Sequence, residues 1–226
     1  MAAAITAPSV SEDIIRISTS PRRLSGSTSQ SSVAVTNTTY AAKRDLLIVS
    51  PYEEEAHQLD LSTLDTASQI LAKALADLRF IRDDHRTAPY VDSFNWPEVI
   101  GSVQKFAETS GFEWKKTDFY IVVFRSRIPP TTVYSDLGAL DKDAHAEATA
   151  SGGFLKYKFS TPDANGRNLA TCVWRNLHDA KVGSLGPLHR KAAGAARHLY
   201  THWEIERLRL VIDDDVKSWD IVKWVD

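Results

Sequence analysis

Residues 154–175, FLKYKFSTPDANGRNLATCVWR, decide the fold. Phe154 to Phe159 alternates large apolar side chains with Lys156 and Lys158, which is the period-two pattern of a strand with two unlike faces. Asn165-Gly166 follows, and Asn-Gly between two strand-like runs is a strong short-range signal for a hairpin. Asn168 to Arg175 then predicts the partner strand, so the two runs are expected to form an antiparallel pair.

The segments on either side of this hairpin extend the pattern. Upstream, residues 119–127 (FYIVVFRSR) are rich in β-branched and aromatic side chains and predict a strand. A helix capped by Ser135 or Asp136 is expected to follow and to run to about Ala150. Downstream, the sequence predicts a short helical turn, a long helix and two strands, in that order: 177–181, Gly186-Pro187 to about Trp203, 206–212 and 218–225.

The predicted order is strand, helix, strand, strand, helix, strand, followed by one more strand. This is the ferredoxin-like βαββαβ order, so the fold class is α+β, with an antiparallel sheet and both helices on one face. The many alanines of the second long helix suit close packing on the sheet. The other face of the sheet then needs a cover, which the N-terminal half, a partner subunit or a ligand could provide.

The N-terminal part of the chain divides in two. Residues 1–42 hold fifteen Ser or Thr residues and few large apolar ones, which predicts a disordered tail. Residues 43–226 are interpreted as a single α+β domain. Within it, residues 43–116 are expected to add a strand and two helices, the second capped by Asn95, and residues 117–226 to form the ferredoxin-like unit.

Composition excludes several classes of protein. The formal charge of −2 offers no basic field for nucleic acid or anionic lipid, and no apolar run approaches the roughly 20 residues that span a bilayer. The single cysteine, Cys172, rules out an internal disulfide and indicates a reducing compartment. The protein is therefore expected in the cytoplasm. A mitochondrial location is the alternative, because the Ser/Thr-rich N-terminus carries Arg16, Arg22 and Arg23.

Two histidines are the candidate catalytic residues. His145 follows Leu137 by eight residues on a predicted helix and so falls near its apolar stripe, where an imidazole could act as acid or base. The alternative is a structural histidine bonded to Asp141, one turn earlier. His189 lies in the first turn of the next long helix, where it could contact a ligand or serve only packing or capping.

For several other side chains, a structural role is the alternative to a functional one. Arg125 and Arg127 end an apolar strand and could bind an acidic group bidentately, or form a salt bridge at the sheet edge. His198 and His202 have the i, i+4 spacing of a metal pair on one helix, but no further ligand is nearby. A solvated helix edge is favoured, and no metal is predicted. Cys172, inside a strand, is interpreted as a small buried hydrophobic residue.

The stretch from Leu169 to Ala180, followed by residues 186–190 (GPLHR), resembles the dimeric α+β barrel superfamily. That group includes antibiotic-biosynthesis-monooxygenase-like and haem-degrading proteins. The matching residues, over 119–212, are Trp174, Ala180, Pro187 and His189. The resemblance implies a hydrophobic pocket between sheet and helices, in which relatives carry out cofactor-independent oxygenation, isomerisation or haem chemistry. The ligand-binding residues expected on this basis are Arg125, Tyr157, Trp174 and Arg175.

Residues 45–226 also resemble an uncharacterised family of fungal proteins of the UPF type. The segments that carry this resemblance are Ser50-Pro51-Tyr52, residues 88–96 (APYVDSFNW), Leu140-Asp141-Lys142 and residues 151–157 (SGGFLKY). The resemblance implies a fungal source and brings no established activity with it.

Two functions stay open. The first is a small-molecule enzyme of the α+β barrel type, an oxygenase or isomerase without a cofactor, in which His145 or His189 handles a proton. Its ligand would be a small hydrophobic or acidic organic molecule, and haem stays an open alternative as cofactor. The second is a non-catalytic ligand-binding or protein-interaction scaffold, which the missing nucleotide and nucleophile motifs fit equally well. Monomer and homodimer both stay open, and neither nucleic acid nor a membrane is expected as a partner.

Overall fold

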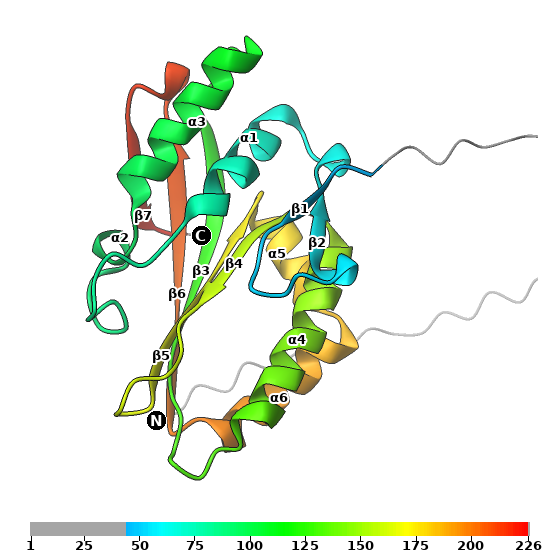
Figure 1. Ribbon diagram of the computed structural model, residues 1–226, viewed down its shortest axis with the longest axis vertical. Coiled ribbons are helices and arrows are strands. Elements are labelled where there is room, and N and C mark those ends of the chain that lie inside the picture. The colour runs from blue at the N-terminus through cyan, green and yellow to red at the C-terminus, as the bar shows by residue number, and fades with distance from the viewer. Residues whose placement is uncertain (1–43, 226) are drawn as a thin grey trace, which may run out of the picture. The chain divides into compact units, whose positions relative to one another are not determined.

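A five-stranded antiparallel sheet forms the centre of the structure, in the order β4-β5-β3-β6-β7 (Figure 1). The computed structural model describes residues 44–225, so the tail predicted over residues 1–42 lies outside the described residues. The strands of this sheet are β3 (Thr117–Arg127), β4 (Phe154–Phe159), β5 (Arg167–Trp174), β6 (His202–Ile212) and β7 (Trp219–Lys223).

The predicted ferredoxin-like order is confirmed. Strand β3 is followed by helix α4 (Tyr134–Ser151), the β4–β5 hairpin, helices α5 (Leu177–Gly183) and α6 (Pro187–Leu199), and β6. Every neighbouring pair of strands in the sheet is antiparallel, and β3 lies between β5 and β6. The additional strand β7 pairs with β6 and extends the sheet at that edge.

The β4–β5 turn shows why Asn-Gly occupies residues 165 and 166. Gly166 has a φ of +73°, and a Cβ atom there would lie 2.2 Å from the carbonyl oxygen of Ile128. The Asp163 carboxylate accepts hydrogen bonds from the backbone N–H groups of Asn165 and Arg167 and so closes the turn. The hairpin prediction is therefore confirmed at its turn as well as in its strands.

The end of the second long helix is predicted wrongly. Helix α6 ends at Leu199, and β6 begins at His202, which pairs with Arg127 of β3. Strand pairing is the cause, because Thr201 donates its backbone N–H to the carbonyl oxygen of Arg127 and starts the ladder there. His198 therefore lies on α6 and His202 on β6, so the two histidines do not form an i, i+4 pair on one helix.

Helix α6 also packs differently from the prediction. It buries none of its residues fully, and its main contacts are with α4 (Figure 1). The alanines of α6 thus belong to an outer helix beside α4 and do not produce a close contact with the sheet.

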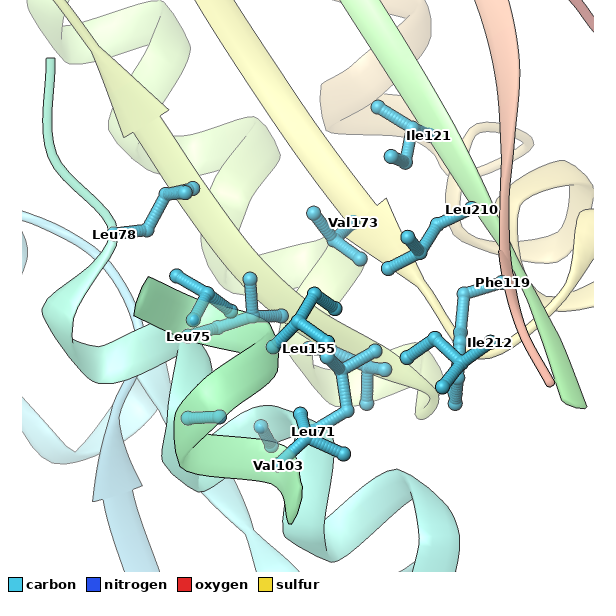
Figure 2. Close-up of a cluster of buried hydrophobic side chains, with 14 of the residues drawn as sticks. Leu71, Leu75, Leu78, Val103, Phe119, Ile121, Leu155, Val173, Leu210 and Ile212 are labelled. Atoms are coloured by element: carbon cyan, nitrogen blue, oxygen red, sulfur yellow. The ribbon is translucent and has the colours of Figure 1, made fainter. Parts of the chain in front are cut away.

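The N-terminal half covers the second face of the sheet, which answers a question that the sequence leaves open. Helices α1 (Thr66–Ala74) and α3 (Trp96–Ser110) pack on the face that carries Leu155 and Leu210. Figure 2 shows these side chains in one buried cluster with Leu71 of α1 and Val103 of α3. Full burial of one such side chain stabilises the fold by roughly 1.5–3 kcal/mol, so this layer is an integral part of the core.

The start of α3 holds one difference from the prediction. Asn95 precedes the helix, but its side chain does not cap it. Its Oδ1 accepts a hydrogen bond from the backbone N–H of Arg79 at 2.8 Å, and its Nδ2 donates to the carbonyl oxygen of Asp77. The shorter elements nearby are α2 (Tyr90–Ser93) and 3₁₀ turns at Leu61–Thr63, Leu75–Asp77 and Asp214–Val216.

The face of the sheet opposite α1 and α3, which carries Tyr120 and Trp174, is called the first face. A small ribbon brings a distant segment to this face. Strands β1 (Leu46–Ile48) and β2 (Gln58–Asp60) pair with each other, and the 3₁₀ turn between them (Glu55–His57) contacts α4. The backbone N–H of Tyr157 on β4 donates to the carbonyl oxygen of Val49 at 2.8 Å and ties the ribbon to the sheet. Residues 49–57 are thereby held against α4.

Small residues let the helices approach the first face closely. Ala148 of α4 and Ala180 of α5 are buried against Phe154 and Trp174. At Gly183 of α5, a Cβ atom would lie 2.3 Å from the Trp174 ring. Among residues 44–225, every helix is too short or too polar to cross a bilayer.

Candidate functional site

A group of buried and partly buried polar side chains lies between α4 and the first face of the sheet. We name it the Asp141 cluster, and its members are Tyr52, His57, Asp141, His145 and Tyr157. Asp141 and His145 are one turn apart on α4 and therefore share a helix face. Tyr157 comes from β4, and Tyr52 and His57 come from the β1–β2 connection, so three separate segments meet here.

The Asp141 carboxylate is held by two tyrosines. Its Oδ1 accepts a hydrogen bond from the Tyr157 hydroxyl, and its Oδ2 accepts one from the Tyr52 hydroxyl, each at 2.6 Å. Burial raises the pKa of Asp141, although the two hydrogen bonds work against that rise. The carboxyl group can therefore take up a proton at a higher pH than an exposed aspartate, and the tyrosines fix its orientation.

The two histidines of the cluster contact each other directly. The Nδ1 atoms of His57 and His145 lie 2.9 Å apart, and each side chain is only 4% exposed. Burial lowers the pKa of His145 to about 3 and also lowers the pKa of His57, so both imidazoles are neutral at pH 7. In a neutral pair one ring must donate its Nδ1–H to the other, which then carries its proton on Nε2.

The outer nitrogen of His145 has no partner. Among the described residues, nothing accepts from or donates to its Nε2 atom, which is buried. An unsatisfied buried polar atom costs about 1–3 kcal/mol, so such atoms are rare unless a water or ligand uses them. The Nε2 atom of His145 is therefore available to form a hydrogen bond with a water molecule or a ligand.

His189 reaches the same region from α6. Its pKa is lowered by burial, and its charge and that of Asp141 affect each other's pKa, which places the two side chains near each other. Within the described residues its Nδ1 atom is also buried without a partner. His189 does not cap α6. The carboxylate of Glu147 on α4 caps it instead, because it accepts hydrogen bonds from the backbone N–H groups of Leu188 and His189, each at 3.0 Å.

The chemistry that this arrangement supports is proton transfer and hydrogen bonding. The Asp141 carboxyl group, whose pKa is raised, and the neutral imidazoles of His57 and His145 lie together beneath α4. Across residues 44–225, no three His, Cys, Asp or Glu side chains converge as they would around a metal ion. Cys172 on β5 is half-buried, and burial raises the pKa of its thiol, which makes it a poor nucleophile.

The family model for PB2B2.08-like proteins matches residues 48–223, which include every residue of the Asp141 cluster. This chain belongs to the PB2B2.08-like family. A relative, UPF0643 protein PB2B2.08 of Schizosaccharomyces pombe, is 35% identical over 179 residues, with 75% of this chain and 80% of the relative covered. The resemblance to an uncharacterised fungal family is confirmed.

The solved structures that are similar to this PB2B2.08-like chain include two that each cover about two-fifths of it. SnoaB, a cofactor-independent oxygenase from Streptomyces nogalater, is 15% identical, with 40% of this chain and 90% of SnoaB covered and a TM-score of 0.34. A conserved protein from Methanosarcina mazei Go1 is 12% identical, with 39% and 89% covered and a TM-score of 0.36. At these TM-scores the matches carry no argument about activity, and the fold rests on the strand order described above.

The structure brings three of the predicted site residues together. His145 and Tyr157 are members of the Asp141 cluster, with ring centroids 5.3 Å apart, and His189 lies beside it. Trp174 is separated from the cluster by the Phe154 ring. The ring centroids of Trp174 and Phe154 are 4.5 Å apart, and those of Phe154 and His145 are 5.1 Å apart.

The two predicted arginines lie elsewhere. Arg125 is on the opposite face of the sheet, where its Nε donates to Glu206 at 2.7 Å and its other nitrogens donate to the carbonyl oxygens of Arg86 and Ala88. Arg175 pairs with Asp179 of α5 at 2.7 Å. Neither guanidinium group is brought to the Asp141 cluster.

Tyr52 and His57 are not among the site residues that the sequence predicts, and Asp141 has a different role from the predicted one. The sequence offers Asp141 as a partner of His145, whereas His145 contacts His57. A signal for part of the cluster was present, because the segments behind the fungal-family resemblance contain Tyr52, Asp141 and Tyr157. His57 follows three glutamates that suggest a solvated loop, and only the path of the β1–β2 ribbon shows that it is buried.

Proposed function

We propose that this PB2B2.08-like protein is a small-molecule enzyme that transfers a proton on an organic substrate held between α4 and the sheet. The observation that carries the proposal is the unpartnered Nε2 atom of His145, one helical turn from the partly buried Asp141. A buried site with a free hydrogen-bonding nitrogen and a carboxyl of raised pKa is suited to acid–base catalysis.

In the proposed reaction, Asp141 and His145 have different roles. The Asp141 carboxylate, made more basic by burial, takes a proton from the carbon next to a carbonyl group of the substrate. His145, whose low pKa keeps it neutral, donates its Nε2–H to the carbonyl oxygen and stabilises the enolate that forms. Return of the proton to another carbon gives an isomer, with no change in oxidation state and therefore no cofactor.

The surroundings of the cluster support an apolar substrate. Aromatic side chains continue from it along the first face toward β6, where Phe124 lies 5.4 Å from the Tyr200 ring and 6.1 Å from the Trp203 ring. Trp203 and Ile205 are half-exposed, so this part of the sheet is open to solvent. A flat, mostly apolar molecule would bury this surface as it approaches Asp141.

Hydrogen exchange provides a test that does not require the substrate to be known. A panel of ketones, aldehydes and keto acids is incubated with the protein in deuterium oxide, and mass spectrometry follows deuterium uptake at carbon. At least one compound is expected to gain deuterium faster than in buffer. If no compound in a broad panel exchanges, the enzymatic proposal is wrong.

A non-catalytic ligand-binding role is the second candidate, favoured by one observation. Both oxygens of Asp141 already accept a hydrogen bond from a tyrosine, as expected of a structural carboxylate. In that case at least one compound would bind and raise the melting temperature of the protein, but that compound would not gain deuterium at carbon.

A further inference from the structure

A hollow of about 570 Å³ lies on the second face of the sheet, away from the Asp141 cluster. We name it the basic hollow. Four arginines, one histidine and two glutamates contribute to its lining, from β3, β5, β6 and the loop before α2. These charged side chains are Arg86, Arg125, Arg127, Arg167, His202, Glu204 and Glu206.

Three basic residues lie side by side across the strands. Arg127 on β3 is directly opposite Arg167 on β5 and directly opposite His202 on β6. Directly paired residues share a face of the sheet, and like charges in such pairs destabilise it. A row of basic residues at this position therefore has a cost to the fold, which an anion bound between them would offset.

Most carboxylates near the hollow are already engaged. Glu206 is paired with Arg125, whose side chain is 12% exposed. Asp163, near Arg86 and Arg167, accepts two backbone N–H groups of its own turn. Glu204 is the remaining carboxylate of the lining, and within residues 44–225 no ion pair joins it to an arginine.

Several guanidinium donors remain available. The Nε of Arg127 donates to the carbonyl oxygen of Asn165, and Arg86 donates to the carbonyl oxygen of Thr161, so both side chains are anchored. These bonds leave both terminal nitrogens of Arg127 without a hydrogen bond to the described residues. Arg86, Arg127 and Arg167 also form no ion pair there. Anchored guanidinium groups with free donors are suited to oxyanions.

We propose that the basic hollow binds a phosphate group, either the free ion or one carried by a small molecule. Arginines from three separate segments converge on one concave site, and its volume is that of a small-molecule pocket. A dianion with several acceptor oxygens matches this arrangement, since one guanidinium group can donate two parallel N–H bonds to two of its oxygens. Glu204 on the lining disfavours a long polyanion such as nucleic acid. The site is independent of the proposed proton transfer.

The test is titration of the full-length protein with inorganic phosphate at constant ionic strength, followed by NMR of the backbone amides. Saturable shifts are expected at residues 127, 167 and 202. Arg127→Gln and Arg167→Gln should each weaken binding roughly tenfold, the loss expected for one charge-assisted contact. Glu204→Gln should tighten binding. Arg190→Gln on α6 makes the same change of charge outside the hollow and should bind as the unaltered protein does.

Glycerol 3-phosphate distinguishes the two sources of phosphate. Tighter binding of the ester than of inorganic phosphate assigns the hollow to a phosphorylated small molecule, and the reverse order assigns it to the free ion. The proposal is overturned if phosphate causes no saturable shifts at the hollow, or if Arg127→Gln, Arg167→Gln and Arg190→Gln weaken binding equally. Melting curves of each variant show whether a loss of binding is a loss of folding.

Discussion

Deuterium uptake catalysed by the Asp141→Asn protein is expected to be about 10²- to 10⁴-fold slower than that of the unaltered protein, the range usual for loss of a catalytic acid or base. Asparagine has the size and shape of aspartate but accepts no proton at neutral pH. It can still accept a hydrogen bond from Tyr52 or Tyr157 through its one oxygen, so the fold should survive.

A matched control lies at the start of the same helix. Asp136 is exposed in the first turn of α4, and Asp136→Asn removes the same charge without touching the substrate site. Its exchange rate should stay within about twofold of the unaltered protein, as for most surface changes remote from a site. Equal rates for the two variants would mean that Asp141 is not the base. A large loss in both would mean that the charge of α4 matters instead.

The second large effect concerns stability and pH. The pKa of His145 is about 3 in the folded protein and about 6.5 in an unfolded chain. Between these values the unfolded chain binds a proton that the folded protein does not. His145 therefore adds stability above pH 6.5 and loses it as the pH falls, by at most about 1.4 kcal/mol per pH unit. From pH 6.5 to 4.5 this amounts to roughly 2–3 kcal/mol.

Asp141 acts in the opposite direction and must be separated from His145. Because its pKa is raised, its contribution to stability declines as the pH rises above its unfolded value. Urea unfolding between about pH 4.5 and 7.5 should give a shallower dependence for His145→Gln than for the unaltered protein. His198→Gln, an exposed change on α6, should keep the original slope. Parallel curves for His145→Gln and the unaltered protein would contradict the burial of a neutral His145.

Local patterns predicted the elements that local forces determine. The Asn-Gly turn and the apolar run of β3 each favour one conformation within a short window, and the structure contains both. The strand predicted at residues 154–159 also forms, but a bulge between Phe154 and Lys156 interrupts its alternation, and Leu155 packs in the core of the second face while Tyr157 lies on the first. The helical spacing of Leu71 and Leu75 likewise predicts a buried helical face, but it does not say which surface that face will meet. That surface is the second face of the sheet.

The errors have a common physical origin in contacts between distant residues. Leu199 and His202 belong to a run that could continue as a helix, and pairing with β3 ends the helix earlier. Asn95 is a good capping residue that bonds instead to the backbone of Arg79. The Asp141 cluster is of the same kind, since its helix supplies Asp141 and His145, while His57 comes from a ribbon and lies 88 residues before His145.

The most direct test of the site is an NMR titration of a protein labelled with ¹⁵N in its histidine rings. The account predicts that His145 stays neutral at pH 5, with its proton on Nε2 and with Nδ1 accepting from His57. If His145 instead titrates near pH 6.5, or carries its proton on Nδ1, it is not the buried neutral donor beside Asp141, and the proposed mechanism is wrong.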